Sequence, residues 1–217
     1  MFKCMIIFSE NGIYAIQLMK ELTMEFIDAY INEVSEICEQ LDKSKINSML
    51  LQLVDLKKRN GRLFILGVGG SAGNASHAVN DFRKLAGIES YAPTDNISEV
   101  TARTNDEGWE TIFEAYLKVS NLNDKDCLLI LSVGGGDLSK KVSVNLCRAI
   151  DFAKLRNVKI LGITGKEDGH THVNADVCLV IPQVNLLNIT PHSEAFQAII
   201  WHLLVSHPKL KVNSTKW

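Results

Sequence analysis

The sequence predicts an α/β domain in which a mostly parallel, doubly wound sheet forms the middle layer of a three-layer sandwich. The chain has 217 residues, of which 46% are hydrophobic, enough for one domain with a fully buried sheet. Short, nearly unbroken apolar segments alternate with longer segments of helical periodicity. Such strands are typical of a parallel sheet that helices cover on both faces. Because these sheets bind ligands beyond the carboxyl ends of their strands, we expect a functional site there.

Two helices are predicted ahead of the first strand. Apolar residues recur at three- and four-residue spacing over residues 26–41 and again over 46–56, and Gly61 follows as a helix stop. A helical hairpin in this place is suited to packing on the domain or to contacts between subunits. The preceding segment shows no clear periodicity, so we expect residues 1–23 to be an extension of uncertain order and residues 24–217 to form a single domain.

Strands and helices alternate from residue 63 onward. Strands are predicted at 63–66, 127–131, 158–163 and 177–181, and helices at 72–86, 109–119, 142–155 and 192–206. No internal repeat interrupts this order, which favours one continuous sheet.

Charge and composition exclude several classes of protein. The net charge is −2 and the 23 Lys and Arg residues are spread along the chain, so a nucleic acid is not expected as the main partner. The five cysteines are odd in number and scattered, which predicts reduced thiols in the core. No apolar segment approaches the roughly 20 residues that span a bilayer. We therefore expect a cytoplasmic protein without a membrane partner.

A glycine-rich loop directly follows the first predicted strand and opens a helix. In residues 67–73, Gly69 and Gly70 let a ligand approach the backbone closely, and free amides at a helix start favour an anion. Ser71 is predicted to cap the helix and to offer its hydroxyl to the same anion. A phosphate group fits this chemistry, although a tight glycine turn with Ser71 as a cap alone has the same pattern.

The same loop also satisfies a dinucleotide-binding fingerprint. Gly67, Gly69 and Ala72 match its glycine pattern, and Glu89 follows at a suitable distance. Glu89, however, precedes any convincing second strand instead of ending one, which disfavours a nicotinamide enzyme.

A second loop of glycine and serine follows the strand at 127–131. Ser132, Gly134 and Gly135 lie at its start, and Ser143 opens the next helix. Two amide-rich loops at one edge of the sheet could share one phosphate. Thr164 ends another strand in the same way.

Two pairs of polar residues have helical spacing. His77 and Asp81 are four residues apart, and Glu194 and His202 are eight apart. These separations are angular offsets of about 40° and about 80°, so each pair can share a helix face. Two imidazoles and two carboxylates suit zinc or another divalent metal, and they equally suit an acid and base pair. Singly, each of these residues is more often structural.

Together these motifs resemble the phosphoheptose isomerases of the sugar isomerase (SIS) fold, over about residues 24–208. The family's G-N-G-G-S-A-x-x-A-x-H-x-x-x-E block corresponds to residues 67–81, its N-D-x-G element to 105–108 and its L-T-G element to 163–165. Its S-T-S-G-x-S-x-N phosphate loop corresponds to residues 132–135 and, after an insertion, 143–145. Its Q-x-x-x-x-x-x-x-H helix corresponds to Glu194 and His202.

The resemblance implies a function and a site. The implied reaction converts sedoheptulose 7-phosphate to D-glycero-D-manno-heptose 7-phosphate through an enediolate, in bacterial heptose synthesis, in a homotetramer with active sites at its interfaces. The implied substrate-binding residues are Gly69, Gly70, Ser71, Asn105, Asp106, Ser132, Gly134, Gly135, Ser143 and Thr164. The implied zinc ligands are His77, Asp81, Glu194 and His202, of which His202, Asp81 and Glu194 are also the expected catalytic groups.

Four departures from the family pattern bear on this expectation. Val68 replaces an asparagine, Gly134 a serine, Asp81 a glutamate and Glu194 a glutamine. The last exchange makes the site more anionic and favours a bound cation. Val68 and the longer second loop keep open the alternative of an isomerase of another sugar phosphate. A non-catalytic protein that binds a phosphosugar is a second alternative, and the presence of His77, His202 and two carboxylates favours an enzyme over it.

Overall fold

The computed structural model describes residues 12–214, with side chains from residue 23 onward. Its α-helices are α1 (Gly12–Gln40), α2 (Lys43–Lys58), α3 (Gly70–Lys84), α4 (Ile97–Glu107), α5 (Ile112–Val119), α6 (Val144–Leu155), α7 (His170–Asn174) and α8 (Ile189–Ser206). Its strands are β1 (Leu63–Leu66), β2 (Ser90–Tyr91), β3 (Cys127–Ser132), β4 (Lys159–Thr164) and β5 (Val177–Val180). Short 3-10 helices are η1 (Pro93–Asp95), η2 (Trp109–Thr111) and η3 (Leu186–Asn188).

The chain divides into two compact units, which meet in sequence between Gln40 and Leu41. The first unit contains α1, a single helix that begins at Gly12, before the start that periodicity predicted. Residues 1–11 of the predicted extension lie outside the described residues. Two helices precede the first strand, as the sequence predicted, and the second of them belongs to the second unit.

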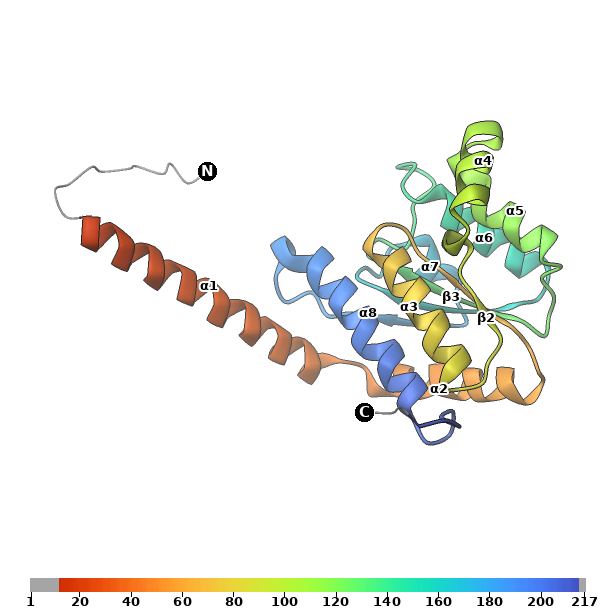
Figure 1. The fold of residues 1–217 in the computed structure, drawn as a ribbon, viewed down its shortest axis with the longest axis horizontal. Helices are drawn as coiled ribbons and strands as arrows, with labels where there is room; N and C mark the ends of the chain where they lie inside the picture. Colours follow the sequence, from red (N-terminus) through yellow and green to blue (C-terminus); the bar gives the residue numbers. More distant parts are fainter. Residues whose placement is uncertain (1–11, 215–217) are drawn as a thin grey trace. The chain divides into compact units, whose positions relative to one another are not determined.

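The second unit is built on a five-stranded sheet with the order β2-β1-β3-β4-β5, and all its strand pairs are parallel. This confirms the predicted doubly wound α/β architecture (Figure 1). The central strands β1 and β3 are buried along their whole length, because helices cover both faces of the sheet. The helices α3 and α8 pack side by side on one face, and α5 packs against α6 on the other.

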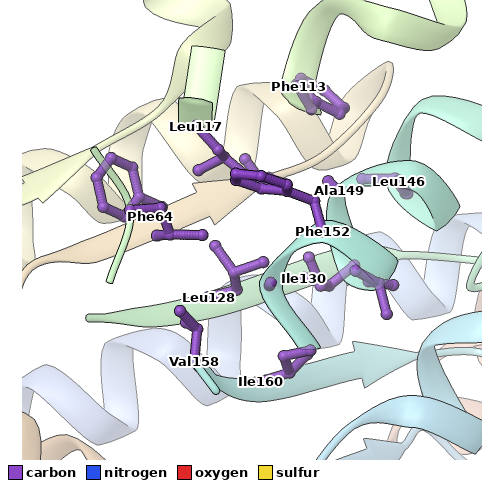
Figure 2. Close-up of a cluster of buried hydrophobic side chains, with 14 of the residues drawn as sticks. Phe64, Phe113, Leu117, Leu128, Ile130, Leu146, Ala149, Phe152, Val158 and Ile160 are labelled. Atoms are coloured by element: carbon purple, nitrogen blue, oxygen red, sulfur yellow. The ribbon is translucent and has the colours of Figure 1, made fainter. Parts of the chain in front are cut away.

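Alternate residues of the strands form the core beneath α5 and α6. Phe64, Leu128, Ile130 and Ile160 project to this face, because successive strand residues point to opposite sides. Figure 2 shows them against Phe113 and Leu117 of α5 and against Leu146, Ala149 and Phe152 of α6. The burial of this face fixes α6, and so fixes the second loop from which α6 starts.

Among the described strands and α-helices, three were not predicted: β2, α4 and the five-residue α7. The strand β2 has only two residues, too few for a periodic pattern, and α4 buries none of its residues fully, although Val100 packs against the core. Among the described residues, no helix is both long and apolar enough to cross a membrane.

Candidate functional site

The predicted loops lie at one edge of the sheet, beyond the carboxyl ends of β1, β3 and β4. The pairs Leu66 with Ile130 and Ser132 with Thr164 set this register. Because neighbouring parallel strands end together, the loops after β1 and β3 are adjacent, with the turn after β4 beyond them. The structure therefore has the edge at which we expected a ligand.

The first loop turns at a glycine in the left-handed region. Gly69 has φ 63° and ψ −129° and is the N-cap of α3, with no side-chain cap. The prediction that Ser71 caps the helix is therefore wrong: Ser71 lies inside the first turn and is buried. Ser71 has this position because the chain turns at Gly69 and is already helical at Gly70. The amides of Ala72 and Gly73 donate to the carbonyl of Gly69 (3.0 and 3.3 Å), which leaves the amides of Gly70 and Ser71 as the donors at this helix start.

The second loop is held by hydrogen bonds around two glycines. Gly135 and Gly136 have φ values of 74° and 84°. The amide of Gly135 donates to Ser132 Oγ (3.0 Å), and the hydroxyl of Thr171 donates to the carbonyl of Gly135 (2.7 Å). Ser132 Oγ thus supports the loop from within, as a buried acceptor.

The insertion in this loop forms a closed turn before α6. The amides of Asp137 and Val142 each donate to the other residue's carbonyl, at 2.9 and 3.0 Å. Ser143 follows as the N-cap of α6 with φ 48°, and its side chain makes no capping bond. Asn145, in the first turn of α6, is fully buried, and its Nδ2 has no partner among the described residues. The start of α6 thus combines a half-buried hydroxyl with an unsatisfied amide donor.

Three of the four predicted metal ligands converge. His77 and Asp81 of α3 and His202 of α8 each offer one donor atom, all within 4.8 Å of one another. Asp81 Oδ2 lies 3.9 Å from His77 Nε2 and 3.8 Å from His202 Nε2. These distances are too long for hydrogen bonds, so the donor atoms are not consumed by each other.

Neighbouring groups orient two of these side chains. His202 Nδ1 lies 2.8 Å from the carbonyl of Ala198, which favours a proton on Nδ1 and a lone pair on Nε2. Asn80 Nδ2 donates to Asp81 Oδ1 (2.8 Å), which leaves Oδ2 toward the imidazoles. Two imidazoles and a carboxylate are donors that zinc accepts, so this cluster fits such an ion.

The fourth predicted ligand lies elsewhere. Glu194 is in the first turns of α8, and its carboxylate lies against Gly70 at the start of α3. It is not part of the three-residue group. Eight residues of helix span about 12 Å, so Glu194 and His202 share a face of α8 without meeting at one point.

Other residues predicted to bind the substrate make local hydrogen bonds or occupy open positions. Asn105 and Asp106 are exposed on α4, where Asn105 Nδ2 donates to Asp106 Oδ1 (2.7 Å). Thr164 is buried, and its hydroxyl donates to the carbonyl of Lys166 (2.9 Å). A Cβ on Gly134 would meet nothing within 4 Å, so this position of the loop is open.

The family model for the SIS domain matches residues 29–165, which include the first and second loops. The chain belongs to the SIS domain family. It is 32% identical over 162 residues to the lincomycin biosynthesis protein LmbN of Streptomyces lincolnensis, a match that covers 71% of this chain and 58% of that protein. It is 26% identical over 164 residues to phosphoheptose isomerase 2 of Campylobacter jejuni, covering 73% of this chain and 76% of that one. A phosphoheptose isomerase structure from Neisseria gonorrhoeae has a TM-score of 0.73 at 21% identity, over 84% of this chain and 97% of that one.

The SIS domain match ends before α8, so the placement of the α8 residues comes from the structure. One residue there was missed in the sequence. Trp201 is fully buried, and its ring lies 4.7 Å from the His77 ring and 3.5 Å from the His202 ring, between centroids. The indole of Trp201 thus packs against both imidazole rings. In the sequence, only its position directly before His202 pointed to a role for Trp201 at the site. Adjacency to His202 does not predict a contact with α3.

Proposed function

We propose that this SIS domain is an aldose–ketose isomerase of a sugar phosphate, converting sedoheptulose 7-phosphate to D-glycero-D-manno-heptose 7-phosphate. The convergence of His77, Asp81 and His202 carries the proposal, because acid and base groups are what an isomerase needs and a passive binding protein does not. The similarity to proteins named phosphoheptose isomerase supports the choice of substrate. The product would then serve bacterial heptose synthesis.

The reaction moves one proton between neighbouring carbons. A base removes a proton from carbon 1 and an enediolate forms; the oxygen on carbon 2 gains a proton, the hydroxyl on carbon 1 loses its own, and the first proton returns to carbon 2. In the metal-free site we assign the proton transfers to His202, whose Nε2 carries the lone pair, and to Glu194, whose carboxylate lies outside the three-residue cluster. Asp81 Oδ2, 3.8 Å from His202 Nε2, would stabilise the imidazolium that forms.

We further propose zinc as the cofactor, held by His77, Asp81 and His202. Zinc at this place would polarise the substrate carbonyl and stabilise the developing oxyanion. A ligand to zinc has no free lone pair, so in the zinc form Glu194 is the group that remains free to carry the proton. Glu194 was expected as a fourth ligand, and its distance from the cluster favours this separate role.

The phosphate of the substrate would bind at the second loop. Ser143 offers a hydroxyl without a capping bond and Asn145 an unsatisfied Nδ2. The amides of Leu146 and Cys147 already donate to the carbonyl of Ser143, so the amino end of α6 offers those of Val144 and Asn145. Glycine at position 134 replaces the family's serine, which shifts the contacts toward backbone amides.

We also propose a homotetramer in which neighbouring subunits complete the site. His77 and His202 have side chains that are 58% and 48% exposed, unusually open for a reacting centre. The exposed face of α8 beside His202 carries Ile199 and Leu203, each more than two-fifths exposed. Apolar residues around a polar centre are suited to burial in an assembly. Sedimentation velocity at several protein concentrations measures the assembly, and a monomer at all of them would contradict it.

Incubation of the purified protein with sedoheptulose 7-phosphate, with and without added zinc, tests the function through analysis of the product. We expect isomerisation, a stimulation by zinc, and a loss of at least about 100-fold in kcat for His202→Ala with an unchanged melting temperature. Binding of the sugar without turnover, in the presence of zinc, would establish the non-catalytic alternative instead.

A further inference from the structure

The carboxylate of Glu194 lies against the first turn of α3. A Cβ added to Gly70 would be 2.6 Å from Glu194 Cδ and 2.7 Å from Oε1, so the carboxylate fills the space that glycine leaves open. Asn74 Nδ2 donates to the carbonyl of Glu194 (2.9 Å) and to Gln197 Oε1 (3.2 Å). The start of α8 is therefore tied to α3 through the Glu194 backbone, which places the Glu194 side chain beside Gly70.

The place that this carboxylate occupies is one that favours an anion. The amino end of α3 carries unpaired amides and the positive end of the helix dipole. The first turn of α3 contains no acidic residue of its own. Glu194 supplies a negative charge there from another helix, so the first loop already has a resident anion.

The amino end of α6 differs in this respect. Its first turn also lacks an acidic residue, the hydroxyl of Ser143 makes no capping bond, and Asn145 Nδ2 is buried without a partner. Because β1 and β3 pair in parallel, these two helix starts lie at neighbouring strand ends. The edge of the sheet thus has two helix starts: the one at α3 lies against the Glu194 carboxylate, and the one at α6 offers an unsatisfied amide donor.

We propose that Glu194 determines specificity by restricting the site to sugars with a single phosphate. The phosphate binds at α6, the reacting carbons lie toward α3 and α8, and the Glu194 carboxylate repels a second phosphate on carbon 1. This inference rests on the proposed function, which sets the reacting end. Two like charges about 5 Å apart repel strongly enough, even near a solvated surface, to weaken binding by about tenfold or more.

Two sugars that differ only at carbon 1 test it: sedoheptulose 7-phosphate and sedoheptulose 1,7-bisphosphate. Their dissociation constants are measured by calorimetry with the wild-type protein, Glu194→Gln and the control Glu39→Gln, which removes an exposed carboxylate of α1. We expect the wild type to bind the monophosphate at least about tenfold more tightly, Glu194→Gln to reduce this preference about tenfold, and Glu39→Gln to keep it. Thermal unfolding verifies that both variants fold.

Each outcome separates the inference from the proposed function. A shift of preference in Glu194→Gln without turnover of the 7-phosphate by the wild type would support the inference and refute the reaction. Turnover of the 7-phosphate, with equal affinities in the wild type or with the same preference in all three proteins, would refute the inference alone. Failure of both sugars to bind any of the proteins would refute both.

Discussion

Substitution of Gly70 by alanine tests whether the position of the Glu194 carboxylate matters for catalysis. The new methyl group would lie 2.6 Å from Glu194 Cδ, about 0.8 Å short of the 3.4 Å at which an ordinary contact begins. The end of a glutamate side chain is flexible, so we expect the carboxylate to move by about 1 Å and the helices to stay in place. A displacement of that size in a reacting group lowers turnover by about 100-fold.

The stability of the Gly70→Ala variant should not fall with its activity. Alanine is favoured over glycine within helices by up to about 1 kcal/mol, which offsets part of any crowding. Urea unfolding followed by circular dichroism measures the free energy of unfolding, and the isomerisation assay measures kcat. We expect a free energy of unfolding within about 1 kcal/mol of the wild type.

A matched control lies one turn further along α3. A Cβ at Gly73 would meet nothing within 4 Å, so Gly73→Ala should raise the free energy of unfolding by up to about 1 kcal/mol and leave kcat unchanged. In the pair Gly70→Ala with Glu194→Ala, the two losses should not add, because both act on one carboxylate. Wild-type turnover in Gly70→Ala, or additive losses in the double variant, would refute the reasoning.

Two further predictions concern the scaffold. Asp126 is buried and accepts hydrogen bonds from Arg62 N, Nε and NH2 at 2.7 to 3.0 Å. Asp126→Ala should therefore lower the free energy of unfolding in urea by about 3–5 kcal/mol. Loss of the exposed Asp55 carboxylate should cost at most about 1 kcal/mol, and equal effects of the two changes would contradict this prediction. Burial raises the pKa of Cys147 from 9.0 to about 11, so its thiol should resist iodoacetamide at pH 8 in the native protein while exposed Cys38 reacts, as peptide mass spectrometry can measure. The unfolded thiol ionises at the lower pH, so this stabilising contribution is complete below about pH 9 and is lost as the pH rises toward 11.

Much of the fold could be predicted because burial leaves a periodic trace in the sequence. The strand at Leu63–Leu66 is apolar at every position, since helices cover it on both faces, and its bounds agree with the prediction. The pair His77 and Asp81 was predicted to share a face of α3, and four-residue spacing is enough to show that. Both results depend on local geometry, which the sequence carries directly.

The parts that could not be predicted depend on contacts between distant segments. The helix α4 buries no residue fully and packs Val100 against the core, too weak a pattern to mark it in the sequence. The N-cap of α3 depends on a backbone turn that only the structure reveals, so Ser71 was predicted to be the N-cap when Gly69 is. The contact of Glu194 with Gly70 joins residues more than a hundred positions apart, and no spacing rule reaches that far.

The departures of this chain from the phosphoheptose isomerase pattern lie where the substrate would bind. The core positions beneath α5 and α6 are apolar and buried, so they do not distinguish one sugar from another. Glu194 and Gly134 instead change the charge at α3 and the hydroxyl count at the second loop, and the turn from Asp137 to Val142 lengthens that loop. A side chain that changes charge beside a phosphorylated substrate alters affinity by an order of magnitude or more, whereas the fold tolerates it. Under the proposed function we therefore expect the choice of sugar to depend on these few positions, and measuring Glu194→Gln against several sugar phosphates tests this more directly than further comparison of folds.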